Sequence, residues 1–137
     1  MQKAVFSIEK YLFNKVSIDL INNISKDISL SFETKGVFNS NDSEYDLIFS
    51  VTAFNEEKTI ESPFLYVQCI GTFKFQNISS FEKIPDYFYR NCIAILFPYL
   101  RAYASLVTTQ ANIPGIILPT LNLSSLESEL RKNTTTK

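Results

Sequence analysis

An α+β fold, with an antiparallel sheet followed by helices, is the architecture that the sequence predicts. Alternating apolar and polar residues, the period of half-buried strands, fill most of the first two thirds of the 137-residue chain. Apolar residues three or four positions apart, the period of an amphipathic helix, fill the last third. Short polar stretches separate the alternating segments, and such connections favour antiparallel neighbours. We therefore expect a single domain over residues 1–132 and a frayed tail over residues 133–137.

Four strands are predicted, over residues 5–20, 28–34, 44–54 and 62–76. In the second of them Ile28, Leu30 and Phe32 share one face, with polar residues between them. In the first strand the alternation changes parity near Asn14, which predicts a β-bulge. The chain has only three glycines, which disfavours small barrels whose turns need many positive φ angles.

A proline interrupts the helical part of the pattern. Pro98 lacks the backbone donor and clashes with the preceding turn, so a new helix starts or a kink occurs there. We expect a short helix over residues 81–94 and a longer one over residues 97–112, with Phe97 and Leu100 pointing into the core.

A last helix is predicted to end near Arg131, with two alternatives for its N-cap. Asn122 is one, because leucines on either side of it are placed to form a hydrophobic staple. Ser124 is the other, because Glu127 follows three residues later as in a capping box.

Composition excludes several kinds of chemistry. The chain has no histidine, which removes the common catalytic triads and most zinc sites. It contains no glycine-rich phosphate loop, and its cysteines, Cys69 and Cys92, do not have metal-binding or redox spacing. We interpret both thiols as small apolar core residues and expect no catalytic residue, metal site or cofactor.

Charge and hydropathy exclude further classes of partner. The net charge is -1 and no basic stripe occurs, so we expect no nucleic-acid binding. The longest nearly uncharged apolar stretch, residues 91–100, is too short to span a bilayer. Charged residues interrupt the N-terminal apolar residues, so no signal-peptide core is recognised, and we expect a cytoplasmic protein.

Two segments in the helical part carry a family resemblance. Residues 95–101 read Ile-Leu-Phe-Pro-Tyr-Leu-Arg, and residues 118–126 contain Leu-Pro followed by Leu-Asn-Leu and a further leucine. The first segment resembles the signature that opens the long helix of SecB export chaperones, and the second resembles that family's proline-containing loop and last helix. The order of the predicted strands is also similar, so the resemblance covers nearly the whole chain.

The resemblance implies a fold, an assembly and an activity. The fold would be a four-stranded antiparallel sheet with helices on one face, and the subunits would form a dimer of dimers. Such proteins hold unfolded polypeptides in apolar grooves without ATP and deliver preproteins to the SecA motor, whereas some relatives protect an antitoxin. By analogy, the client groove would be lined by Ile28, Leu30, Phe32, Leu126 and Leu130.

Docking to SecA is expected to be weak. SecB proteins that serve SecA are strongly acidic and present carboxylates on an exposed sheet surface. Asp19 retains one such position, but Lys15 and Tyr66 occupy two others where the family often has acids. This departure favours a dedicated, antitoxin-linked chaperone as the alternative.

Two other classes of function stay open from the residues alone. Aromatic side chains occur on both faces of the predicted strands, as where Phe64 and Tyr66 alternate with Leu65 and Val67. One layer of helices covers one face of a sheet, so the other face needs a partner subunit or a client. The chain could therefore be a structural interaction subunit, or a small-ligand binder or enzyme with a pocket between sheet and helix.

Overall fold

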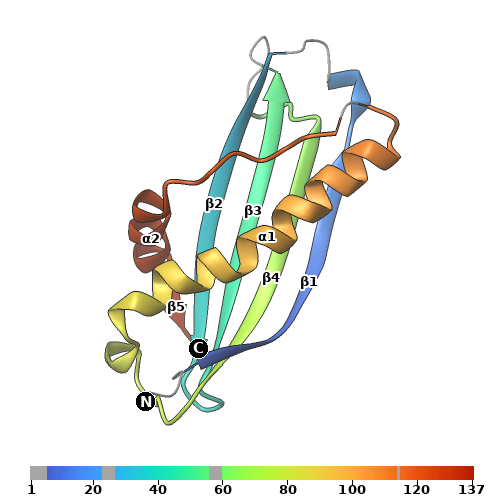
Figure 1. Cartoon of the computed structure of the whole chain (residues 1–137). Helices are drawn as coiled ribbons and strands as arrows, with labels where there is room; N and C mark the ends of the chain where they lie inside the picture. The colour runs from blue at the N-terminus through green and yellow to red at the C-terminus, as the bar shows by residue number, and fades with distance from the viewer. Residues whose placement is uncertain (1–5, 23–26, 56–59, 114) are drawn as a thin grey trace.

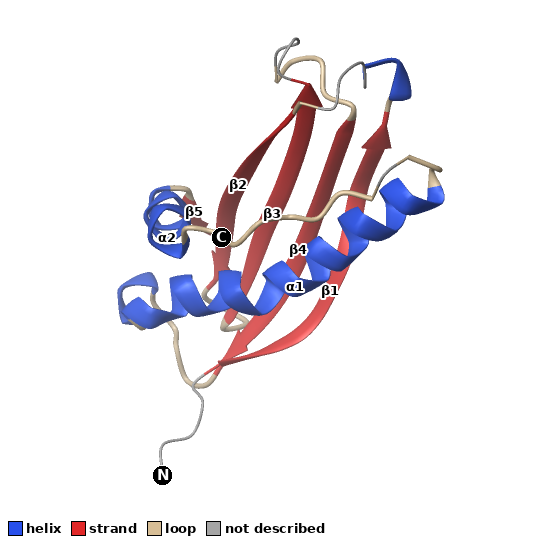
Figure 2. Ribbon diagram, turned by 45° about the horizontal axis from the view of Figure 1, so that its top comes forward, coloured by secondary structure: helices blue, strands red, loops and turns tan. Residues whose placement is uncertain are grey.

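Five strands form one layer of the molecule and two α-helices form the other (Figure 1). The computed structural model describes residues 6–22, 27–55, 60–113 and 115–137. The strands are β1 (Phe6–Ile18), β2 (Ile28–Asn39), β3 (Glu44–Asn55), β4 (Leu65–Phe75) and β5 (Thr134–Thr136). The helices are α1 (Asp86–Gln110) and α2 (Leu123–Lys132), and short 3-10 turns occur at Leu20–Asn22 and Phe81–Lys83. Both α-helices lie on the same face of the sheet (Figure 2), as the α+β prediction required.

The expectation of a four-stranded antiparallel sheet is corrected by the C-terminal tail. The strand order is β1-β4-β3-β2-β5, and β5 runs parallel to β2 beside Gly36–Phe38. The hydroxyl groups of Tyr45 and Thr134 lie 2.6 Å apart, and the Lys137 amide donates to the Phe38 carbonyl at 2.7 Å. Threonine favours extended backbone. Residues 134–136 therefore form a strand of a mixed sheet where fraying was expected.

Strand β1 contains two bulges. Its register with β4 shifts between Ile8 and Lys10 and again between Phe13 and Lys15. The second shift confirms the bulge predicted near Asn14, and the first, at Glu9, was not predicted. Each bulge changes which parity of side chains faces the helices, so Phe6, Ile8 and Phe13 all pack against the core.

Burial alternates along the central strands, as the sequence pattern predicts. On β3, Tyr45, Leu47, Phe49 and Val51 are fully buried beneath the helices, while the residues between them are mostly less buried. The side of the sheet without helices is termed the open face. Its side chains include Leu12, Ile48, Ile70, Lys15 and Tyr66.

Of the two alternatives at Pro98, the start of a new helix is wrong, because α1 continues through this residue. Pro98 and Ala94, whose carbonyl loses its usual donor, both lie on the exposed side of α1, so water can reach that carbonyl. Leu96 and Leu100 are fully buried on the other side. Their burial offsets the cost of an internal proline, about 3 kcal/mol. Leu100 thus points into the core as predicted, whereas Phe97 is half-buried.

The predictions for the ends of the helices have mixed outcomes. In α2 the side chain of Asn122 accepts from the Ser125 amide at 3.2 Å, so Asn122 is the N-cap and Ser124 is not. Of the short helix predicted over residues 81–94, Phe81–Lys83 form a 3-10 turn, whereas residues 86–94 belong to α1, which Pro85 caps. Strand β2 extends to Asn39, five residues past its predicted end at residue 34, because β3 pairs with it throughout.

Candidate functional site

An apolar row runs along the helix-covered face of β2. Ile28, Leu30 and Phe32 lie at alternate positions, as the sequence predicts, and pair with β3. Ile28 is 39% exposed, whereas Leu30 and Phe32 are partly buried against the core. The Phe32 ring contacts Phe49 on β3 and Phe97 on α1, with centroids 6.3 Å and 6.2 Å away. These three side chains, termed the β2 row, form apolar surface at the margin of the core.

Helix α2 lies beside β2, but farther along the strand than the β2 row. The Thr34 hydroxyl donates to the Leu126 carbonyl at 3.3 Å, and the Asn133 side chain donates to the Thr34 carbonyl at 3.3 Å. Leu126 is 8% exposed and Leu130 is fully buried. In this conformation both leucines belong to the core, so the structure does not bring the five expected groove residues into one exposed trough.

The loop between α1 and α2 crosses in front of the sheet (Figure 1) and forms a second apolar surface with α1. Ile116 and Leu118 are buried, whereas Ile117 between them is 74% exposed. A recess with a volume of about 430 Å³ lies between this loop and α1. The recess, termed the α1–loop recess, is lined by Phe97, Pro98, Arg101, Ala102, Ser105 and Ile117. The sequence did not predict this recess, because its two walls come from separate segments and no local sequence pattern indicates that they pack together.

A buried hydroxyl holds the loop against α1. Thr108 is fully buried, and its hydroxyl donates to the Ala104 carbonyl at 2.8 Å. The same oxygen accepts from the Ile116 amide at 3.0 Å. Because an unpaired buried amide is costly, this contact stabilises the position of the loop and hence of the recess wall.

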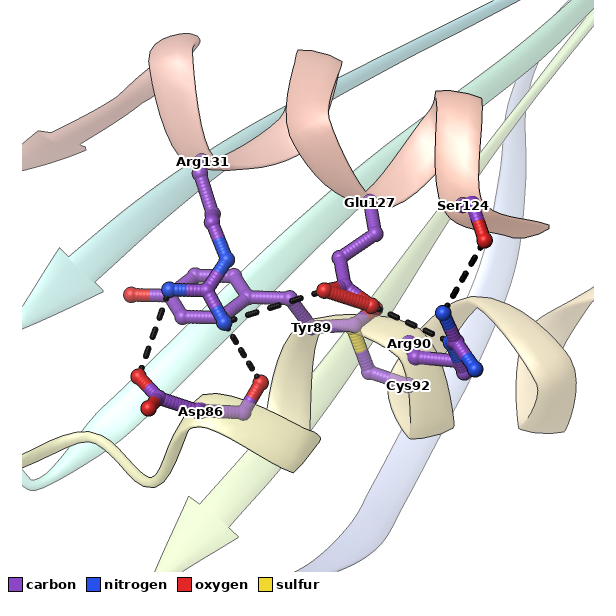
Figure 3. A network of polar contacts seen from close by, with 7 residues as sticks. All are labelled: Asp86, Tyr89, Arg90, Cys92, Ser124, Glu127 and Arg131. Carbon is purple, nitrogen blue, oxygen red and sulfur yellow. Dashed lines mark hydrogen bonds and ion pairs between the residues drawn. The ribbon is translucent and has the colours of Figure 1, made fainter.

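Charged residues connect the first turns of α1 to α2 (Figure 3). Arg90 pairs with Glu127 at 3.1 Å and donates to the Ser124 hydroxyl at 3.0 Å. Arg131 pairs with Asp86 at 3.3 Å and donates to the Asp86 carbonyl at 2.8 Å. Glu127 lies 3.8 Å from Arg131 as well, so its carboxylate joins the two pairs. The network orients α2 across the first turns of α1.

Aromatic packing supports the same network. The Arg131 guanidinium lies over the Tyr89 ring, 4.5 Å from its centroid. Burial raises the pKa of the Tyr89 hydroxyl, although the positive charge of Arg131 opposes this effect. Burial also raises the pKa of the nearby Cys92 thiol, and it raises the pKa of Cys69 to about 11. Both thiols are buried, so they lack the lowered pKa and the access of a reactive cysteine.

The residues expected to dock a partner on the exposed sheet surface have local roles. Asp19 accepts from the Ile21 amide at 3.1 Å and so stabilises the turn after β1. The Tyr66 hydroxyl donates to Gln68 at 2.9 Å, and Gln68 donates to Asn14 at 3.3 Å. Tyr66, Gln68 and Asn14 are uncharged, so this part of the open face lacks the carboxylates that a cationic partner would need. Within the described parts of the chain, no group of acids and cysteines is suited to hold a metal ion.

Residues 2–133 match the family model described as preprotein translocase subunit SecB. An uncharacterized protein of Methanocaldococcus jannaschii is 28% identical over 136 residues, which cover 95% of this chain and 87% of that protein. The protein-export protein SecB of Thiobacillus denitrificans is also 28% identical over 136 residues, covering 91% of this chain and 86% of that protein.

The fold is similar to that of a solved SecB-like chaperone from Mycobacterium tuberculosis, in complex with a ChAD peptide from the HigA1 antitoxin. The TM-score is 0.59 at 14% identity, and the match covers 85% of this chain and 91% of that one. At this identity the likeness concerns the fold. It agrees with the mixed sheet and the two helices on one of its faces.

Proposed function

Because the chain belongs to the SecB family, we propose that it is an ATP-independent holdase that binds unfolded polypeptides on its β2 row. SecB-family proteins are chaperones, and this chain is accordingly no enzyme. The observation that carries the proposal is the position of Ile28, Leu30 and Phe32, which are apolar, adjacent and incompletely buried. We place the protein in the cytoplasm, where SecB-family chaperones act as soluble proteins.

Client binding would combine desolvation with backbone pairing. Each apolar client side chain that becomes buried contributes about 1.5–3 kcal/mol before the cost of ordering the client. Among the described strands, β5 pairs with the outer edge of β2 only at Gly36–Phe38. The edge beside the β2 row can therefore accept an extended segment as an added strand. Backbone pairing is independent of client sequence, which suits a chaperone with many clients.

Leu126 and Leu130 enter the proposal in a conditional role. Both are buried where α2 packs on the core, so a client would reach them only if α2 moved away from β2. We therefore assign the first contact to the β2 row and assign the two leucines to a widened groove.

Suppression of aggregation of an unfolded client without ATP tests the proposal. The double variant Ile28→Ser, Leu30→Ser should suppress aggregation less than the wild type, while the mass of the oligomer stays the same. Ile48→Ser, Ile70→Ser is the matched control, because it removes similar apolar surface from the open face. Equal suppression by both variants would refute the groove assignment, and so would loss of the oligomer in the first variant.

A client-specific role is the second candidate. The structural relative from Mycobacterium tuberculosis is a SecB-like chaperone bound to an antitoxin peptide. Together with the mild net charge of -1, this favours an antitoxin as an alternative client. Strong preference for one antitoxin segment over unrelated unfolded proteins would distinguish this role from general export.

Delivery to SecA is the weakest part of the proposal. Asp19 and Tyr66 would lie at the docking surface, but the nearby hydrogen bonds of Tyr66 and Gln68 are neutral. Charged docking needs complementary acids and weakens with salt. Titration with a SecA zinc-tail peptide at low salt should show weak binding, and submicromolar, salt-sensitive binding would contradict this expectation.

A further inference from the structure

Arg101 differs from the other arginines of the described chain in having no partner. Arg90 and Arg131 are both engaged in the contacts between α1 and α2. Arg101 makes no hydrogen bond or ion pair with another described residue, yet it lines the α1–loop recess. Four of the five other lining residues, Phe97, Pro98, Ala102 and Ile117, are apolar. Arg101 is itself exposed, so its guanidinium is accessible to an anionic group that binds beside these apolar side chains.

We propose that the α1–loop recess is a specificity pocket that takes an apolar client residue adjacent to a carboxylate, with Arg101 binding the carboxylate. This inference rests on the proposed holdase function and names the class of segment that the chaperone prefers. The recess volume of about 430 Å³ lies in the usual range of ligand pockets. Guanidinium binds carboxylate through paired, charge-assisted hydrogen bonds, which adds direction to an otherwise unspecific apolar contact.

The recess is continuous with the β2 row through one side chain. Phe97 lines the recess and also contacts Phe32, the last member of the β2 row. An extended segment paired with the edge of β2 could therefore place its next residues past Phe97 and into the recess. The Thr108–Ile116 hydrogen bond keeps the opposite wall in place. Ser105 is the remaining polar residue of the lining.

Affinities of a matched peptide set, measured by fluorescence anisotropy at low and at raised salt, test this inference. The peptides share one apolar sequence with blocked ends and contain Phe-Glu, Phe-Gln or Phe-Lys at the centre. A further pair ends in Phe, with either a free carboxylate or an amide. The wild type should bind the Phe-Glu peptide about tenfold tighter than the Phe-Gln peptide at low salt, and less so at raised salt. The terminal pair shows whether a chain end serves as well as a side chain.

The variants are Arg101→Gln and Arg101→Lys, with Lys83→Gln as a control of equal charge change at an exposed site. Arg101→Gln should abolish the preference for carboxylate, Arg101→Lys should retain part of it, and Lys83→Gln should leave it unchanged. Equal binding of all peptides by the wild type would overturn the inference and leave the holdase function standing. Failure to bind any peptide would overturn both. A change of oligomer mass in Arg101→Gln would assign the residue to a contact between subunits and overturn the inference as well.

Discussion

The ring of Phe97 on α1 lies edge-on against the ring of Phe32 on β2, with centroids 6.2 Å apart and planes inclined by 69°. Edge-to-face geometry of this kind is favourable beyond the burial of the rings themselves. The contact joins the β2 row to the α1–loop recess, so the two apolar surfaces share one side chain. Phe97 therefore contributes both to the stability of the fold and to the proposed client-binding surface, and the two contributions can be measured separately.

Replacement of Phe97 with alanine should weaken client binding more than it weakens the fold. Phe97 is half-buried, so we expect a loss of about 1–3 kcal/mol of unfolding free energy, less than for a fully buried phenylalanine. Leu100→Ala is the matched comparison, because Leu100 is fully buried and its truncation should cost about 2–5 kcal/mol. Urea unfolding and peptide affinity measured on both variants check this order. A larger loss of affinity in Leu100→Ala would contradict it.

Thr108→Val should destabilise the loop between the helices. The valine keeps the shape but leaves the buried Ile116 amide without its acceptor, which costs about 1–3 kcal/mol. Faster hydrogen exchange of the Ile116 amide should accompany a lower urea midpoint. Thr109→Val, at an exposed neighbouring position, should change stability by no more than about 0.5 kcal/mol. Equal midpoints for the two variants would show that the hydroxyl does not hold the loop.

Arg131→Gln should loosen α2. The change removes the pair with Asp86 and the contact with the Tyr89 ring, both near the surface, so we expect a loss of about 1–2 kcal/mol. The difference from the wild type should shrink at high salt, because screening weakens the exposed pair. Lys132→Gln removes the same charge from the next residue and is the control. The melting temperatures of the wild type and the two variants, measured at two salt concentrations, make the comparison. Equal melting temperatures for Arg131→Gln and Lys132→Gln would show that the network does not stabilise α2.

Stability should fall as the pH rises above about 9, because the buried thiols resist ionisation. Burial raises the pKa of Cys69 from an ordinary value of 9.0 to about 11, and it raises that of Cys92 as well. As the pH rises, the thiols of the unfolded chain lose their protons before those of the folded chain. Above pH 9 the folded state therefore binds more protons, and each thiol lowers the free energy of unfolding by about 1 kcal/mol per pH unit. Below pH 9 their contribution is fully present. Urea titrations at several pH values measure the slope, which should be shallower in Cys69→Ala, Cys92→Ala, and an unchanged slope would exclude this cause.

The chain should form a homo-oligomer, and we expect a tetramer built as a dimer of dimers. Residues 91–100 alone are too short to span a bilayer, but α1 as a whole is long and apolar enough by length and composition, and only about a third of its apolar part is buried within this chain. Tyr99 and Leu106 remain 39% and 52% exposed on this helix. Closed symmetry commonly covers such apolar surface. Light scattering should show the tetramer, and a stable monomer at micromolar concentration would contradict it. Leu106→Glu should dissociate the assembly, whereas Gln76→Glu, at an exposed position after β4, should not.

Local patterns in the sequence determined the class of the fold and most of its elements. The alternation of Ile28, Leu30 and Phe32 placed these residues on one face of β2, because side chains alternate across a strand whatever the strand pairs with. The parity change near Asn14 likewise reported a bulge, and Asn122 reported a helix start through its own side chain. Each of these features depends on residues a few positions apart.

The tertiary structure decided what depends on distant partners. Thr134–Thr136 became a strand only because β2 offered an edge to a segment almost 100 residues away. The helix α1 continues through Pro98 because the sheet buries the flanking leucines, a contribution larger than the local preference of proline. The α1–loop recess, with Arg101 in its lining, exists only where the loop folds back on α1. Local patterns report which residues avoid water, whereas the partner that covers each of them is set by the packing of the whole chain.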